Sequence, residues 1–174
     1  MNWTELLTTQ MKAAYASTEG LLAMVKDEDL AWKPPSGENW MTIGQLLRHI
    51  TDACGMSSKG FVTGDWGLPE GFDPTEMTPD EMLPPAETLP TIESVAEAKR
   101  LLAEDKEIAF AMIGEAGEER LAKDMMSAPW DPRTLPLGLW LSQMVTHLES
   151  HKAQLFYYLK LQGVPVDTSH LWSG

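Results

Sequence analysis

The sequence predicts an all-α protein folded as a four-helix bundle, with a long crossover loop between the second and third helices. Four long segments repeat apolar residues at spacings of three and four, which is typical of amphipathic helices. Little of the chain alternates polar and apolar residues as a strand does. A proline-rich stretch at residues 63–90 separates the second helical segment from the third. Helices with one apolar face each bury those faces best against one another, as in a bundle.

The length of 174 residues is typical of one domain, so we expect residues 1–174 to form a single unit. A chain of this size can bury a core that needs neither a disulfide nor a metal for stability. Cys54 is the only cysteine, which excludes an intramolecular disulfide and fits a reducing compartment. Any bound metal is therefore expected to serve function.

The first two helices are predicted at residues 3–26 and 42–62. The first carries the apolar stripe of Trp3, Leu6, Leu7, Met11, Ala14, Thr18, Leu21, Leu22 and Val25. Residues 27–41 contain Pro34, Pro35 and Gly37 and predict a loop. Thr42 and Gln45 have the spacing of a capping box, and the stripe after them continues through Leu46, Leu47, Ile50, Ala53 and Phe61.

Residues 63–90 form a long acidic loop, with no lysine or arginine between Lys59 and Lys99. A connection this long is functional, disordered, or a crossover between distant ends of a bundle. We expect the crossover, because apolar side chains are available to pin it to the body: Trp66, Phe72, Met77, Met82 and Leu83.

The third helix begins near Thr91 or Ser94, where Ser94 and Glu97 form a second capping-box pair, and ends at Gly114 and Gly117. Residues 118–135 are expected to be irregular, with room for a short strand or hairpin. The last helix is predicted from about Pro136 to about Gln162, where Gly163 and Pro165 follow.

The charge pattern limits the classes of partner. A net charge of -13 repels phosphate backbones, so nucleic acid is not expected as a main ligand. No apolar stretch approaches the roughly 18 residues of a membrane span, and no targeting segment is recognisable at the start. We expect a cytoplasmic protein with a small-molecule substrate, and a homodimer is an open alternative to a monomer.

Three of the four histidines lie within the apolar stripes and predict a metal site. His147 and His151, four residues apart, share one face of the last helix at about 6 Å. His49 lies between Leu46 and Ala53 on the inner face of the second helix. Converging imidazoles in an apolar interior need partners for their nitrogens, and a divalent cation supplies them. The alternative is that each histidine is a hydrogen-bonded core residue.

Other polar residues are weaker candidates for a role at this site. Asp105 lies in the apolar stripe of the third helix, where it could orient a histidine or act as a base, or reach water from the stripe edge. Gln45 and Gln154 share the histidine faces and could contact the rings or join helices. Glu149 follows His147 by two residues, which matches no zinc-protease motif and predicts that it faces solvent.

Two segments carry a family resemblance that spans nearly the whole chain. Residues 41–50, Met-Thr-Ile-Gly-Gln-Leu-Leu-Arg-His-Ile, resemble the second-helix motif of the DinB/YfiT-like superfamily. Residues 140–163, with His147 and His151, resemble its last-helix motif. The resemblance implies a four-helix bundle with a long crossover between helices two and three. It also implies that His49, His147 and His151 bind a divalent metal ion, most often zinc or nickel.

The resemblance also bears on activity. Characterised members of the superfamily include transferases and isomerases that use low-molecular-weight thiols, so a thiol cosubstrate is an expectation for this chain. The function expected is activation of a thiol or water for transfer to, or hydrolysis of, a small electrophile. Two alternatives stay open: a non-catalytic bundle that binds a metal or small ligand in a stress response, and a structural dimerisation module whose histidines only form hydrogen bonds.

Overall fold

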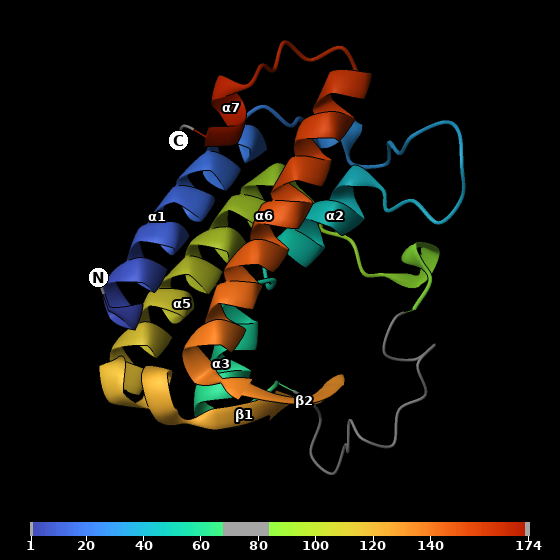
Figure 1. The fold of residues 1–174 in the computed structure, drawn as a ribbon. Coiled ribbons are helices and arrows are strands. Elements are labelled where there is room, and N and C mark those ends of the chain that lie inside the picture. The colour runs from blue at the N-terminus through green and yellow to red at the C-terminus, as the bar shows by residue number, and fades with distance from the viewer. Residues whose placement is uncertain (1, 68–83, 173–174) are drawn as a thin grey trace.

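The computed structural model describes residues 2–67 and 84–172, and its long helices pack as a bundle (Figure 1). The helices α1 (Trp3–Leu22), α5 (Val95–Lys123) and α6 (Leu137–Leu161) lie side by side. The shorter α2 (Ile43–Ile50) and α3 (Gly55–Thr63) follow one another along the remaining side and pack against α5 and α6. Single-turn helices η1 (Asp27–Asp29) and η3 (Ala86–Thr88) lie in the connections. The all-α bundle predicted from the sequence is confirmed.

The prediction of one continuous second helix is wrong. The chain leaves helical geometry at residues 51–54, between α2 and α3. A contact with α5 stabilises the restart, because the carboxylate of Asp105 accepts a hydrogen bond from the backbone N–H of Met56 at 2.9 Å. This carboxylate satisfies a donor that a helix N-terminus leaves without an internal partner.

Two other boundaries differ from expectation. Helix α1 ends at Leu22, four residues before Lys26. Gly117 interrupts α5 with φ of 65°, but a short helical segment resumes and runs to Lys123. The hairpin expected as one option after it is present, with β1 (Met125–Ala128) antiparallel to β2 (Asp131–Pro136) and Met126 opposite Leu135. The indole N–H of Trp140 donates to the carbonyl of Met126 at 2.9 Å and ties the hairpin to α6.

The apolar faces meet in one core that runs between the helices. Phe61 stacks on Trp140 with ring centroids 4.9 Å apart, and Trp66 packs edge-on against Phe61. Trp66 therefore pins the start of the crossover, as expected, whereas Phe72, Met77, Met82 and Leu83 lie outside the described residues. Cys54 is fully buried in this core.

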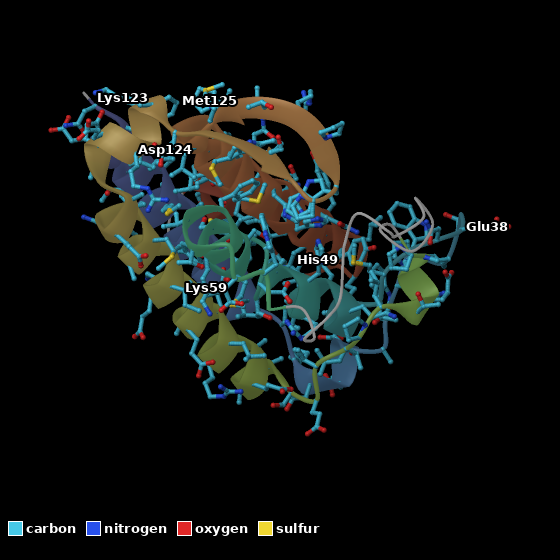
Figure 2. The ribbon with its side chains drawn as sticks, turned by 90° about the horizontal axis from the view of Figure 1, so that it is seen from below. Glu38, His49, Lys59, Lys123, Asp124 and Met125 are labelled. Carbon is cyan, nitrogen blue, oxygen red and sulfur yellow. The ribbon has the colours of Figure 1, made fainter. Side chains whose placement is uncertain are left out.

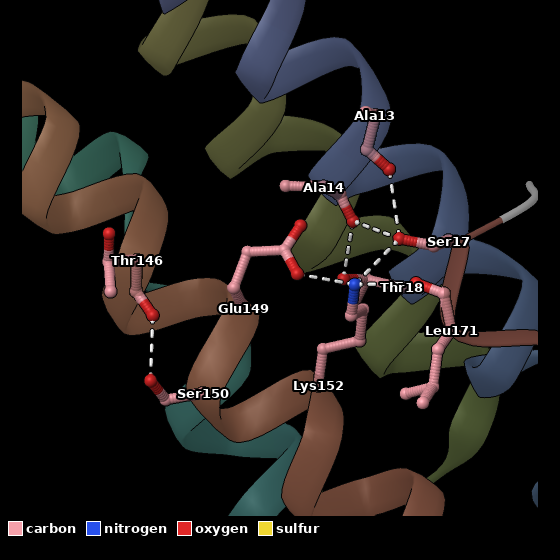
Figure 3. Close-up of polar contacts among 9 residues, drawn as sticks. All are labelled: Ala13, Ala14, Ser17, Thr18, Thr146, Glu149, Ser150, Lys152 and Leu171. Carbon is pink, nitrogen blue, oxygen red and sulfur yellow. Dashed lines mark hydrogen bonds and ion pairs between the residues drawn. The ribbon is translucent and has the colours of Figure 1, made fainter. Parts of the chain in front are cut away.

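The segment after α6 returns to the body as α7 (Ser169–Trp172), held by a buried lysine of α6 (Figure 3). Lys152 is 2% exposed, and its ammonium donates to the Leu171 carbonyl at 2.8 Å, to Ser17 Oγ at 3.2 Å and to the Glu149 carboxylate. Glu149, expected to face solvent, has a side chain that is 36% exposed, and it also supplies the counter-charge that the burial of Lys152 requires. Within the described residues, no helix combines the length and the apolar character needed to cross a membrane.

Candidate metal centre

The three histidines predicted from the sequence converge between α2 and α6. His49 comes from α2, and His147 and His151 come from successive turns of α6. Their ring centroids are 4.4 to 5.0 Å apart, and one nitrogen from each ring lies within 4.8 Å of the other two. Figure 2 shows His49 on its helix within the body of the molecule, away from the outlying loop that carries Glu38.

Local hydrogen bonds fix the helix that carries His49. The Thr42 side chain accepts from the backbone N–H of Gln45, and the Gln45 side chain accepts from the N–H of Thr42, which completes the predicted capping box. The Gln45 amide also donates to the carbonyl of Leu89 at 2.9 Å. Gln45 therefore links α2 to the far end of the crossover, and these hydrogen bonds do not involve a histidine.

The Nδ1 atoms of both α6 histidines have oxygen partners. His147 Nδ1 lies 3.2 Å from the carbonyl oxygen of Ala53, and His151 Nδ1 lies 3.1 Å from Gln154 Oε1. Both oxygens accept only, so each Nδ1 carries the ring proton and each Nε2 keeps its lone pair. Both rings therefore have Nε2 available as a metal ligand.

Gln154 extends the support of His151 to the start of α2. Its amide donates to the hydroxyl of Tyr158 at 3.0 Å, and that hydroxyl donates to the carbonyl of Met41 at 3.1 Å. Gln154 was expected on the histidine face of the last helix, and there it contacts His151. Through Tyr158 it also links α6 to the residue before Thr42, the N-cap of α2.

The surroundings of His49 and His151 favour the neutral form of both rings. Burial, together with the nearby His151, His147 and Arg48, lowers the pKa of His49 from 6.5 to about 4. Burial also lowers the pKa of His151, although its hydrogen bond with Gln154 opposes the change. Neutral imidazole is the form that binds metal, so His49 and His151 are in their binding form at neutral pH.

The donor set fits a divalent transition metal. Nitrogen ligands lie about 2.0–2.1 Å from zinc, so two of them are about 3.3–3.4 Å apart on a tetrahedral ion and about 2.8–3.0 Å apart when adjacent on an octahedral one. The Nε2 atoms of His49 and His147 are 3.1 Å apart. Three protein nitrogens leave at least one position open for water or a substrate atom, as in catalytic rather than closed structural sites.

A small cleft of about 40 Å³ opens beside His49, and sequence reasoning missed the charged pair on its rim. Its lining residues are Gln45, Arg48, His49, Asp52, Leu89 and Pro90. Arg48 donates to Asp52 at 2.7 Å and to Thr51 Oγ1 at 3.3 Å. The spacing of His49 and Asp52, three residues apart, was the available signal, because such residues share a helix face.

Asp105 lies outside this cleft and is buried, with 2% of its surface exposed. Its carboxylate accepts from the Tyr15 hydroxyl at 2.6 Å and from the backbone of Met56. The alternative that it reaches water is wrong, and these hydrogen bonds do not involve a histidine ring. Burial raises the pKa of Asp105 above its ordinary value, and both hydrogen bonds oppose that rise.

Four tryptophans that lie in or next to loops have different surroundings. Trp40 lines a wider surface cleft of about 710 Å³ with Lys33, Gly37, Glu38, Asn39, Pro85 and Glu87. None of the three converging histidines lines that cleft, so its size alone does not make it the reactive centre. Trp140 is buried, and Trp66 and Trp130 pack on each other with ring centroids 5.4 Å apart.

Comparison with known protein families identifies the family of this chain. The family model described as the DinB superfamily matches residues 10–155, most of the chain. The chain belongs to the DinB superfamily. The match includes all three histidines, so the triad lies in the part of the chain that is DinB-like. A search of curated proteins found no match.

Proposed function

We propose that this DinB protein is a metal-dependent enzyme in which His49, His147 and His151 hold one divalent ion. The observation that carries the proposal is the convergence of three ring nitrogens within 4.8 Å, two of them on rings whose Nδ1 atoms already have oxygen partners. A bound zinc or nickel ion would lower the pKa of a water or thiol in its open position.

The proposed reaction is attack of a low-molecular-weight thiol or water on a small electrophile. The cleft beside His49 suits delivery of a single small atom, since about 40 Å³ is near the volume of one water. Arg48 and Asp52 on its rim supply a cation and a carboxylate where a polar cosubstrate would enter.

The metal half of the proposal is tested by titrating purified protein, without a histidine tag, with zinc and with nickel. One equivalent is expected to bind the wild-type chain, and His147→Ala is expected to abolish stoichiometric binding. His170→Ala is the matched control, because His170 lies near the chain end and bonds to Asp167. Undiminished binding in His147→Ala would refute the assignment of the triad.

The catalytic half is tested by following thiol consumption against a panel of small electrophiles, with metal-loaded and metal-stripped protein. We expect turnover only in the loaded protein, and none in His147→Ala. Equal rates with and without metal would refute metal-dependent catalysis even if the ion binds.

The small volume of the cleft favours a second candidate, a metal-binding bundle without catalytic activity. In that case the ion would have no exchangeable ligand. Adding azide or cyanide to the cobalt-substituted protein separates the two candidates, because an open position gives a changed visible spectrum and a closed one gives none.

A further inference from the structure

The break between α2 and α3 presents a backbone carbonyl to the candidate metal centre. Ala53 lies within this break, and its carbonyl oxygen is the partner of His147 Nδ1 at 3.2 Å. The direction of this carbonyl is set by the backbone conformation of residues 51–54. The orientation of His147 therefore depends on what fixes residues 51–54.

Asp105 fixes the end of this break. One carboxylate oxygen accepts from the N–H of Met56 at 2.9 Å, and the other accepts from the Tyr15 hydroxyl at 2.6 Å. Gly55, between Ala53 and Met56, packs so closely on α5 that a Cβ atom there would lie 1.9 Å from the Asp105 carbonyl oxygen. The start of α3 is thus clamped between α1 and α5, two residues beyond Ala53.

The clamp is shielded from water. Asp105 is 2% exposed, and Tyr15 and Cys54 beside it are fully buried. Hydrogen bonds in such surroundings are stronger than at the surface, and their loss is not repaired by solvent. A change at Asp105 must therefore be absorbed by movement of the chain that it holds.

We propose that Asp105 and Tyr15 are positioning residues for His147, which act through the backbone of residues 53–56. They hold the Ala53 carbonyl against Nδ1, which keeps the ring proton on Nδ1 and the lone pair on Nε2. The consequence for metal binding rests on the proposed function, whereas the effect on the His147 ring is a property of the metal-free protein.

The test compares the His147 tautomer in zinc-free wild-type, Asp105→Ala, Asp105→Asn and Tyr15→Phe proteins. Two-bond ¹⁵N–¹H correlation spectra at pH 8 report which ring nitrogen carries the proton. Wild type is expected to hold the Nδ1 proton, and Asp105→Ala to shift toward the Nε2-protonated form. Asp105→Asn keeps an oxygen acceptor for Met56 and is expected to restore the wild-type tautomer, while Tyr15→Phe gives an intermediate shift.

Zinc affinity gives a second readout. The dissociation constant is expected to rise about tenfold in Asp105→Ala, as for other partners of metal-bound histidines, and to stay near wild type in Asp105→Asn. Leu121→Ala is the control for lost stability, because it empties a buried site on the same helix sixteen residues further on. It should lower the unfolding midpoint without changing tautomer or affinity.

A wild-type His147 tautomer in folded Asp105→Ala would overturn the proposal, and so would a shift in Leu121→Ala equal to that in Asp105→Ala. If Asp105→Ala does not fold, the Tyr15→Phe protein tests the proposal instead. A wild-type His147 tautomer in Tyr15→Phe would then overturn it. If wild type binds no zinc, the metal proposal fails, but the tautomer still decides the role of Asp105.

Discussion

His49 and His147 face each other through their Nε2 atoms, 3.1 Å apart. Because the Ala53 carbonyl holds a proton on His147 Nδ1, His147 offers only a lone pair at this contact. In the metal-free protein His49 must then donate from Nε2. Both Nε2 atoms can face one cation only if the His49 proton moves to Nδ1. The contact can therefore hold a proton or a metal ion, but not both.

The metal-free protein is expected to lose stability as the pH falls from about 6.5 to about 4. The pKa of His49 is about 4 in the fold against 6.5 when unfolded, so in this window the unfolded chain binds more protons. The full shift corresponds to about 3 kcal/mol, which partial exposure of the ring reduces to about 1–2 kcal/mol. Urea unfolding at pH 7.5 and pH 5 in the presence of a chelator measures it.

His49→Gln is the control for this pH dependence. Asp52 and Asp105 have raised pKa values and act in the opposite sense, so the comparison between wild type and the variant isolates the histidine. The variant is expected to lose less stability than wild type between the two pH values. Identical losses in both proteins would contradict the prediction.

Gln154→Ala is expected to weaken zinc binding about tenfold. Without Gln154 Oε1, nothing at that position holds the proton on His151 Nδ1, so the ring can rotate or change tautomer. Tyr158→Phe, which removes only the far end of the Gln154 contact, should weaken binding less. Competition with a chromophoric chelator measures the constants, and Gln10→Ala on the exposed side of α1 is the matched control. Equal affinities in Gln154→Ala and Gln10→Ala would refute the role of Gln154.

The bundle and the histidine triad could be predicted because both follow from local periodicity. His147 and His151 share a face at four-residue spacing, and His49 lies in the stripe of a helix whose start carries a capping box. These signals need only neighbouring residues. Periodicity alone does not give the pairing of α2 with α6, which the structure shows.

The break between α2 and α3 could not be predicted in this way. Ile50, Ala53 and Phe61 continue an apolar pattern across it, whereas the contact that stabilises it joins Met56 to Asp105, 49 residues away. The ion pair of Lys152 with Glu149 could not be predicted for a related reason. Lys152 lies between Leu148 and Leu155 in the stripe, but its counter-charge and the chain end that covers it are set by tertiary packing.

The pair of Glu149 and Lys152 is expected to respond unequally to removal of either partner. Glu149→Gln leaves a 2%-exposed ammonium with only neutral acceptors, which costs about 3 kcal/mol. Lys152→Met leaves a carboxylate whose side chain is 36% exposed and can be hydrated, so the cost is about 1 kcal/mol or less. Urea unfolding at pH 7 measures both.

Glu119→Gln is the matched control for Glu149→Gln, because Glu119 pairs with Lys123 on the surface with both side chains at least 74% exposed. That variant should change stability by less than about 0.5 kcal/mol. Lys152→Met should also speed hydrogen exchange in α7, because the bond to the Leu171 carbonyl is lost. A larger loss in Lys152→Met than in Glu149→Gln would show that the hydrogen bonds from Lys152 to Ser17 and Leu171 outweigh the charge.

Substituting alanine at two glycines should have opposite effects. At Gly55 the new Cβ would lie 1.9 Å from the Asp105 carbonyl oxygen, which belongs to the α5 backbone and cannot turn aside. We expect Gly55→Ala to cost about 3 kcal/mol or more and to weaken zinc binding, because the start of α3 must move away and take Ala53 with it. At Gly114, within α5, no heavy atom beyond the adjoining residues and backbone of its own helix lies within 4 Å of the new Cβ. Gly114→Ala should therefore stabilise the protein by about 0.5–1 kcal/mol, since alanine loses less backbone freedom in a helix. Thermal and urea unfolding measure both, and a Gly55→Ala protein as stable as Gly114→Ala would show that α3 does not rest on α5 as described.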